Sequence, residues 1–394
     1  MHPATTAQIL IFGAGNIGRS FIGQIFSRAG FEVVLVDVDR ELVTELNRHG
    51  SYTVVHRHPD GREEQLEIAP VRAVDGRDSA AVAAALASVQ YVATSVGAAA
   101  LPRVLPHLAR EMERRSAATL PPLDIILAEN IHGAGDLVRA AVPGAGVVEC
   151  SVGKMVPIVP QELRTQDIRT VYAEAFNTLI VDRDGWKNAI PPVPELFPVS
   201  PIAAWIDRKL YIHNLGHATC AYLASAQDKS IEYIWQAVAD ADILSRTRQV
   251  MRATAEGLLR EYPGVFTMES LEEHIEDLLY RFSSRSLGDT VYRVGRDLQR
   301  KLGPGDRIMG SIRLLQRQQC ETAPLEDVYR AALTFRARDD QGEQFPPDRE
   351  FLDSLARART DGPPEEVRLI LAETSGLNRE DRLDQALLER ILVS

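Results

Sequence analysis

A glycine-rich turn near the amino terminus constrains the fold of this chain more than any other feature. Residues 8–12 (QILIF) are almost wholly apolar, as expected of a buried parallel strand, and the turn GAGNIG follows at once at 13–18. A helical pattern comes next, and a second apolar strand, 31–36, ends at Asp37, 19 residues after Gly18. Strand, turn, helix, and a strand that ends in an acidic residue at this distance together predict a dinucleotide-binding βαβ unit.

The same residues predict which dinucleotide binds. The glycines let a pyrophosphate approach the backbone, and the helix N-terminus supplies N–H groups and the positive end of a dipole. Asp37 can accept hydrogen bonds from both hydroxyls of the adenosine ribose, whereas a 2′-phosphate would meet a like charge, so we expect NAD rather than NADP. The alternative is a tight turn with an incidental Asp. The expected NAD-binding residues are Gly13, Ala14, Gly15, Asn16, Ile17, Gly18, Asp37, Val96, Gly97 and Asn130.

Two later strands should bring further groups to the same edge of the sheet. Residues 89–94 end in TSVG, and residues 124–127 are followed by Glu129 and Asn130. Because ligands bind at the carboxyl ends of strands in a doubly wound sheet, we expect Gly97 near the middle of the cofactor and Asn130 near the nicotinamide. A plain turn role is the alternative for both residues. Arg19, just inside the first helix, either contacts phosphate or is a solvated surface residue.

The rest of the chain divides into two halves of different composition. Residues 51–55 and 65–69 flank an Asp-Gly turn and predict a β-hairpin insertion, and 171–181 predicts a strand that extends the sheet. The stretch 191–201 carries five Pro and predicts a stiff linker or strap, and everything after it predicts helices.

With 394 residues, the chain is too long for one ordinary core. We therefore expect an α/β fold with a Rossmann-type, doubly wound NAD-binding domain at 1–195. An all-α substrate domain follows at 196–394, and the substrate is expected between the two.

The composition of the chain restricts the classes of molecule that it is expected to bind. A net charge of −11 argues against a nucleic-acid or anionic-membrane binder, so the expected partner is a small-molecule substrate. The three Cys are widely spaced, which predicts no metal cluster and suits a reducing compartment. With no secretory segment before the first strand and no apolar run of about 18 residues, we expect a cytoplasmic protein. The oligomeric state, monomer or small homo-oligomer, stays open.

The stretch 209–220 is the candidate centre of the chemistry. It holds Lys209, Asn214 and His217 in the pattern K-x4-N-x2-H, and the last two share one face of a helix. The chain has five Lys and 39 Arg, so a Lys kept here is notable: a buried amine can lose its proton, and a guanidinium cannot. Lys209 is therefore a candidate general base. The alternative is a surface Lys beside a helix that carries a core His.

A second candidate is the basic stretch 289–307 in this acidic protein. Arg293, Arg296 and Arg300 recur at helical spacing within an expected helix at 288–301, and would form one basic face. That face either holds a polyanion, such as a phosphate, or is solvated.

Together these motifs resemble the long-chain polyol dehydrogenases of the mannitol dehydrogenase family. The resemblance rests on GAGNIGR at 13–19, Asn130, RKLYIHNLGHATCAYL at 208–223, and the string from Arg281-Phe282 to GDR at 305–307, and it runs nearly end to end. It implies a metal-free hydride transfer between NAD and a secondary alcohol. It implies Lys209 as catalytic acid/base, Asn130 and Asn214 as hydrogen-bond donors to the reacting oxygen, and His217 as a substrate-orienting residue.

Some positions depart from the family pattern. Gly153 and Lys154 stand where the family has Asp and Arg, and Ser284 and Arg285 stand where it has Asn and Pro. These changes leave the chemistry intact and add positive charge near the expected substrate end. The candidate substrate-binding residues are Lys154, Arg293, Arg296 and Lys301.

The leading hypothesis is therefore the interconversion of mannitol 1-phosphate and fructose 6-phosphate with NAD. A related dehydrogenase of another polyol, or a hexuronate reductase, is the second possibility. A non-catalytic NAD-binding sensor is the third.

Overall fold

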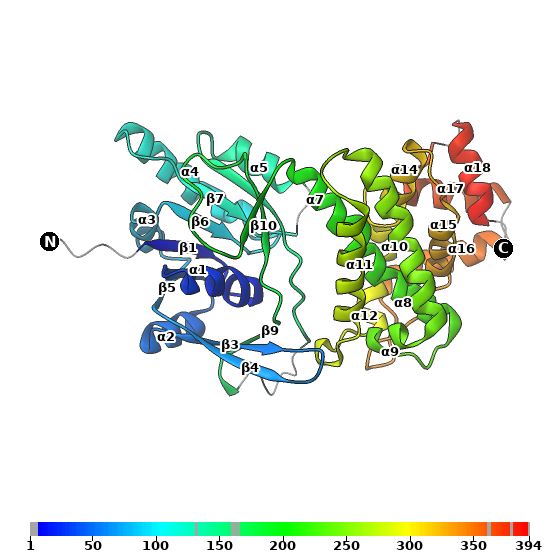
Figure 1. The fold of residues 1–394 in the computed structure, drawn as a ribbon, viewed down its shortest axis with the longest axis horizontal. Coiled ribbons are helices and arrows are strands. Elements are labelled where there is room, and N and C mark those ends of the chain that lie inside the picture. The colour runs from blue at the N-terminus through cyan, green and yellow to red at the C-terminus, as the bar shows by residue number, and fades with distance from the viewer. Residues whose placement is uncertain are drawn as a thin grey trace. The chain divides into compact units, whose positions relative to one another are not determined.

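The computed structural model describes residues 7–130, 133–158, 163, 166–360, 364–378 and 381–392. The chain forms two compact units, Met1–Ile206 and Asp207–Ser394, each with its own core. The first unit is an α/β structure and the second is helical, as expected from the sequence (Figure 1).

An eight-stranded sheet forms the centre of the first unit (Figure 1). Its strands lie in the order β11-β10-β8-β7-β6-β1-β2-β5, and neighbouring strands are parallel except for β8 and β10. The order runs outward in both directions from β1, which is the reversal that defines a doubly wound sheet. The bounds are β1 Gln8–Phe12, β2 Glu32–Asp37, β5 Val71–Asp75, β6 Tyr91–Thr94, β7 Asp124–Leu127, β8 Gly146–Ser151, β10 Leu179–Asp182 and β11 Leu196–Val199.

Both faces of this sheet are covered, which explains why its central strands are apolar throughout. Ile9 and Ile11 point to one face, and Leu10 and Phe12 to the other. The first face packs against η1 Gly18–Gly23, α1 Gln24–Arg28 and α2 Arg40–His49. The second packs against α3 Ser79–Ala87, α4 Leu101–Ala117 and α5 Ala134–Ala141.

A small sheet contains the expected hairpin. β3 Tyr52–Arg57 and β4 Glu63–Ile68 are antiparallel, and β9 Val171–Glu174 adds to β3 in parallel. The expectation of one strand over 171–181 is wrong, because the chain leaves the extended path after β9 and only β10 joins the main sheet. An unbroken run of strand-forming residues does not reveal that its two ends pair with different sheets.

The proline-rich stretch is also more ordered than expected. Within 191–201, β11 pairs in parallel with β10 at the edge of the main sheet. An edge strand tolerates Pro198 because a proline lacks only the donor that would point away from the sheet. The first unit thus extends past residue 195 and includes β11.

The second unit surrounds a central helix. α8 packs against α9, α10, α12 and α15, and its residues 218–224 are buried on every side. α7 Ile202–Arg208 spans the boundary between the two units. The helices that follow it are η2 Lys209–Asn214, α8 Leu215–Gln227, α9 Ile234–Ala239, α10 Ala241–Glu261, α11 Met268–Phe282, η3 Arg285–Leu287, α12 Val291–Gly295, α13 Leu298–Lys301, α14 Met309–Arg317, α15 Ala323–Leu333, α16 Pro346–Thr360, α17 Pro364–Ser375 and α18 Arg382–Leu392. In the described part of the chain, none of the helices is long and apolar enough to cross a membrane.

Two helical stretches are interrupted. Within the helical second half, the helical pattern of residues 230–262 divides at Asp240, whose carboxylate accepts from two backbone N–H groups at the start of α10. The helix expected over 288–301 divides between α12 and α13, where Asp297 adopts a φ of 74°. Both breaks depend on the backbone conformation of one residue, which the spacing of apolar residues along a helix does not predict.

Candidate functional site

In the glycine turn of the first unit, Gly13 and Gly18 are closely packed against backbone atoms, whereas Gly15 is open. Gly13 has a φ of 94°, and a Cβ there would lie 2.6 Å from the Ser95 carbonyl oxygen. A Cβ on Gly18 would lie 1.9 Å from the Gly13 carbonyl oxygen. A Cβ on Gly15 would meet no described atom within 4 Å, so the backbone there is accessible to a ligand. This is the arrangement that a pyrophosphate needs.

A π-helical turn, η1, follows the glycines. The Gln24 N–H donates to the Arg19 carbonyl, five residues back, and the Tyr52 hydroxyl donates to the same carbonyl at 2.7 Å. Gly23 makes room for Tyr52, because a Cβ there would lie 2.3 Å from that hydroxyl. The Arg19 side chain is buried and donates to the backbone carbonyls of Ala14, Ile168 and Arg169. Arg19 is therefore a brace for the turn rather than a solvated residue.

Two carboxylates organise the strand ends around this turn. Asp37 Oδ2 accepts from the Ala14 N–H at 2.7 Å. Asp37, the residue expected to bind the ribose, therefore contacts the glycine turn directly. Glu129 accepts from the N–H groups of Val96 and Gly97, each at 2.9 Å. Sequence reasoning singled out Val96 and Gly97 but missed Glu129, which joins the ends of β6 and β7. Asn130 follows directly and is exposed.

Lys154 occupies a different environment from the one expected. Its side chain is buried in the first unit, where Nζ donates to Asn177 Oδ1 at 2.7 Å and lies 5.3 Å from the centre of the Phe21 ring. Its ammonium group therefore packs against η1.

The candidate catalytic residues of the second unit lie on a second π-helical turn, η2. The Leu215 N–H donates to the Leu210 carbonyl, five residues back, instead of four. In such a turn, residues five apart are related as residues four apart are in an α-helix, so the spacing from Lys209 to Asn214 places both on one face. His217 continues that face one α-helical turn later. All three side chains are half-buried, whereas the residues between them are mostly buried.

A hydroxyl from α10 contacts the π turn. Thr254 Oγ1 lies 2.8 Å from the Tyr211 carbonyl oxygen and 2.9 Å from the Met251 carbonyl oxygen of its own helix, and its one proton is shared between these acceptors. That carbonyl would accept from Leu215 in an α-helix, and a side chain inserted into the ladder is a known cause of such irregularities. The turn that aligns Lys209 with Asn214 is therefore contacted by a residue about 40 positions away.

The electrostatics of Lys209 suit a base. Burial lowers the pKa of Lys209 to about 8, and the positive charge of Arg307 contributes in the same direction. His213, in the same turn, is buried, and burial followed by the charge of Arg281 holds its pKa well below the usual range. Near pH 8, a substantial fraction of Lys209 is thus a neutral amine, and His213 is neutral.

His217 is held by groups that sequence reasoning missed. Its ring stacks on Phe282 with centroids 4.8 Å apart and planes 13° from parallel. Its Nε2 lies 3.3 Å from Asp289 Oδ2, and Asp289 also pairs with Arg293. Burial opposes ionisation of Asp289, but hydrogen bonding to His217 and the charges of both partners outweigh it and lower its pKa. The position of Asp289 four residues before Arg293 was the available signal.

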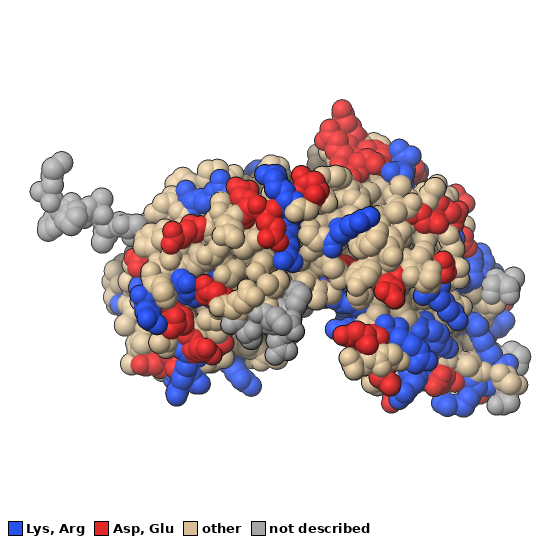
Figure 2. All heavy atoms as spheres, turned by 90° about the horizontal axis from the view of Figure 1, so that it is seen from below, with Lys and Arg blue, Asp and Glu red and all other residues tan. Residues whose placement is uncertain are grey.

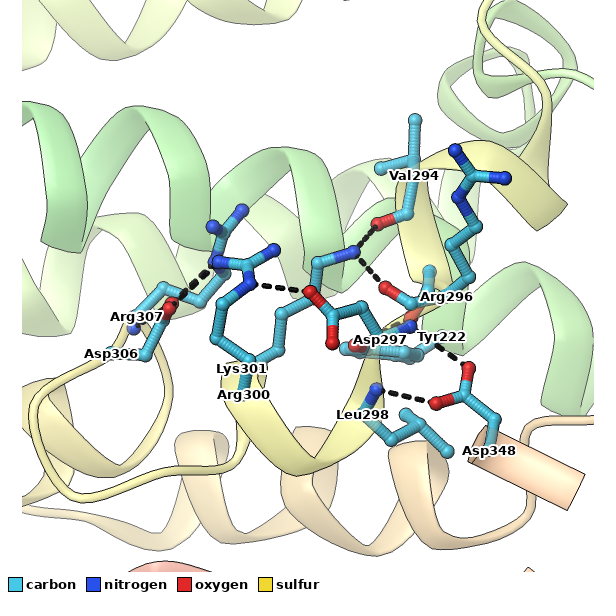
Figure 3. Close-up of polar contacts among 11 residues, drawn as sticks. Tyr222, Val294, Arg296, Asp297, Leu298, Arg300, Lys301, Asp306, Arg307 and Asp348 are labelled. Carbon is cyan, nitrogen blue, oxygen red and sulfur yellow. Dashed lines mark hydrogen bonds and ion pairs between the residues drawn. The ribbon is translucent and has the colours of Figure 1, made fainter. Parts of the chain in front are cut away.

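The basic stretch does not form the single face that its spacing predicted (Figure 3). Arg293 pairs with Asp289, Arg296 lies over the Tyr292 and Phe345 rings, and Arg300 pairs with Asp297 and Asp306. Positive and negative side chains are likewise interspersed over the face drawn in Figure 2.

Lys301 closes the break between α12 and α13 (Figure 3). Its buried amine donates to the carbonyls of Val294 and Arg296, while Asp348 accepts from the N–H groups of Asp297 and Leu298. Burial, with the charges of two nearby guanidiniums, lowers the pKa of Lys301 to about 7. A neutral amine has two N–H bonds, one for each carbonyl.

Comparison with known proteins places this geometry in a family. The sequence profile of the mannitol dehydrogenase Rossmann domain matches residues 7–194, and that of the mannitol dehydrogenase C-terminal domain matches residues 201–391. The chain belongs to the mannitol dehydrogenase family. This membership confirms the predicted class, a dehydrogenase with a Rossmann-type domain and a helical C-terminal domain.

Individual proteins with similar sequences support this family membership. Mannitol-1-phosphate 5-dehydrogenase of Halalkalibacterium halodurans is 33% identical over 350 residues, which cover 84% of this chain and 88% of that protein. The protein of the same name from Shouchella clausii is 32% identical over 343 residues, with the same coverage.

Two solved structures share the fold at lower identity. D-sorbitol dehydrogenase in its substrate-free form superposes with a TM-score of 0.75 at 17% identity, covering 98% of this chain and 95% of that chain. Pseudomonas fluorescens mannitol 2-dehydrogenase, in a ternary complex with NAD and D-mannitol, gives 0.70 at 18% identity and covers 99% and 95%.

Proposed function

We propose that this chain is an NAD-dependent dehydrogenase that interconverts mannitol 1-phosphate and fructose 6-phosphate. The observation that carries the proposal is the π turn η2, which lines up Lys209 and Asn214 on one face, with His217 one turn later. The names of the relatives at 32% and 33% identity support a phosphorylated substrate pair.

NAD fits the first unit. The backbone at Gly15 is open, and the N-terminus of the following helix can receive the pyrophosphate. Asp37 lies beside the glycine turn, where its carboxylate favours a ribose with both hydroxyls over a 2′-phosphate. When bound, NAD exchanges a hydride with the carbinol carbon of the substrate.

In this proposal, residues of the second unit transfer the proton of the reacting hydroxyl and donate hydrogen bonds to its oxygen. In the oxidising direction, Lys209 as a neutral amine takes the hydroxyl proton, and in the reducing direction its ammonium returns that proton. The Asn214 amide donates to the oxygen as negative charge develops on it, and Asn130 is proposed as a second amide donor. His217, held by Asp289 and Phe282, orients the substrate hydroxyls.

Of the four residues expected from the sequence to bind the substrate, the geometry favours two as phosphate ligands. Arg293 and Arg296 have exposed side chains and remain candidates for a phosphate. Lys301 and Lys154 are buried and donate to backbone or amide oxygens of their own units, which favours structural roles for both amines.

A substrate panel tests the proposal. NADH oxidation is measured with fructose 6-phosphate, fructose and a series of hexuronates, and fructose 6-phosphate is expected to give by far the highest kcat/KM. A clear preference for fructose or a hexuronate would replace the proposed substrate. NADH binding without turnover of any of them would favour the sensor.

Substitution of the base tests the mechanism. Lys209→Ala is expected to abolish turnover and leave NADH binding, followed by fluorescence, unchanged. Lys187→Ala, on another of the five Lys, is the matched control. Turnover that survives in Lys209→Ala would exclude Lys209 as the acid/base.

A further inference from the structure

The side chain of Arg307 lies against the turn that carries the proposed base. Its Nη1 donates to the backbone carbonyl oxygen of Asn214 at 3.4 Å, and its Nε donates to Asp306 Oδ1 at 2.7 Å. The side chain is only 13% exposed. The Arg307 guanidinium is thus fixed beside the last residue of η2.

A second guanidinium holds this arrangement in place (Figure 3). Arg300 Nη1 donates to Asp306 Oδ2 at 2.9 Å, so the one carboxylate is shared between Arg300 and Arg307. The Arg307 backbone also participates, since its N–H donates to Asp306 and its carbonyl accepts from the Ser311 hydroxyl at 2.6 Å. Asp306 is thus shared between the two guanidiniums, and Arg300 also pairs with Asp297, while Arg307 keeps its contact with the Asn214 carbonyl.

The other titratable groups around η2 do not supply the same field. His213 of the turn and His274 of α11 are buried, and burial with nearby cations lowers the pKa of each well below its usual range, so both are neutral at pH 7. Arg281 of α11 acts on those two histidines and pairs with Asp277, and His217 of α8 pairs with Asp289. The pKa of Lys209 responds to burial and then to Arg307.

We propose that Arg307 is a positioning residue of the reaction, which fixes the end of η2 through the Asn214 carbonyl and repels a proton from the Lys209 amine. The inference rests on the proposed role of Lys209. A cation at this place makes the ammonium form less favourable, so the base is available at a lower pH. A neutral side chain at 307 would remove both the repulsion and the backbone contact, and a Lys at 307 would keep the charge.

The pH profile of polyol oxidation separates these two contributions. In Arg307→Gln, the midpoint of the rise in kcat/KM with pH is expected to move up by about half a unit to one unit, which lowers the rate below the midpoint about three- to tenfold. Arg307→Lys is expected to restore the midpoint. The control is Arg317→Gln, in which an exposed Arg on the next helix loses the same charge, and its midpoint should match the wild type.

A second measurement needs no turnover. The chain has five Lys, so the 15N-labelled side-chain amines give few NMR signals, and Lys209→Met assigns the one of interest. Its titration midpoint is expected near 8 in the wild type and higher in Arg307→Gln. Were the protein to show no dehydrogenase activity, the proposed function would fail while this titration still decided the influence of Arg307. An unchanged midpoint in Arg307→Gln, with slower turnover at every pH, would overturn the inference and leave Arg307 a purely structural residue.

Discussion

Asp289 is the residue on which the orientation of His217 depends. Its carboxylate contacts the imidazole on one side and Arg293 on the other, in a buried position where each partner is needed to offset the cost of the charge. A neutral amide at 289 would keep the shape but lose the charge, and it can present a donor to His217 where an acceptor is required.

We expect Asp289→Asn to raise the KM for the polyol and lower kcat/KM about tenfold or more, because His217 would lose its fixed orientation. NADH binding should not change. The matched control is Glu276→Gln on α11, an exposed carboxylate paired with Arg248, for which wild-type kinetics are expected. If Asp289→Asn kept the wild-type KM, the contact with His217 would have no part in substrate binding.

At the residue scale, the sequence identifies the proposed catalytic residues more readily than the residues that contact and orient them. Lys209, Asn214 and His217 share a short motif, and Asp37 stands at a fixed distance from the glycines. Glu129, Asp289 and Thr254 reach their partners only through the fold, and a carboxylate or hydroxyl in isolation gives no sign of which backbone group it will meet. Lys301 lay in a basic stretch that predicted a phosphate ligand, and in the structure its amine donates to the carbonyls of Val294 and Arg296, a contact that the spacing of basic residues does not predict.

Among the elements, η2 is the one whose geometry matters most. An α-helix would place residues five apart about 140° from one another around the axis, so Lys209 and Asn214 would diverge. The π turn reduces that offset to roughly the 40° that separates residues four apart in an α-helix, and the Thr254 hydroxyl contacts the Tyr211 carbonyl. Periodicity predicted a helix through this region and could not predict the extra residue in its turn, because the contacting hydroxyl lies on α10.

Thr254→Val tests this dependence. The substitution keeps the shape of the side chain but removes its hydrogen bond, so we expect a loss of about 1 kcal/mol in the free energy of unfolding and a lower kcat with unchanged NADH binding. The control is Thr219→Val on α8, since the buried hydroxyl of Thr219 has no hydrogen-bond partner among the described residues and its removal should not destabilise the protein. Equal effects of the two substitutions would contradict the role of Thr254.

For the whole molecule, buried bases link stability to pH. The pKa values of Lys209 and Lys301 are lowered by burial to about 8 and about 7, from an ordinary value of 10.5. The unfolded chain therefore binds more protons than the folded one between pH 7 and 10.5, and stability rises with pH in that window. His213 and His274, whose pKa values are lowered from 6.5 by burial, add a loss of stability as pH falls below 6.5.

We expect the free energy of unfolding to rise by roughly 2–4 kcal/mol from pH 6 to pH 9, measured by calorimetric melting across that range. Lys301→Met should reduce this rise, although it also leaves two carbonyls without their donor and lowers stability at pH 9. A melting temperature that is flat or falls between pH 6 and 9 would show that these amines keep their protons in the folded state.

The fold as a whole was the most predictable level. The βαβ unit, the hairpin and the helical second half follow from local patterns of apolar residues and turns, each of which acts over a few positions. The differences concern long-range pairing: β9 and β10 joined different sheets, and β11 joined the sheet edge from a stretch that proline content predicted to be a stiff linker or strap. Strand partners are chosen by the whole core, so a window of ten residues does not contain that information.

The π turn also makes the length of this segment part of its function. Deleting one residue from 210–213 would let the turn relax to an α-helix while leaving Lys209, Asn214 and His217 in the chain. Lys209 and Asn214 would then be four residues apart in an α-helix, a spacing that keeps both side chains on one face. The five-residue spacing and the π turn therefore compensate for each other: an α-helical turn of the present length would separate Lys209 from Asn214, whereas a turn shorter by one residue would keep them together.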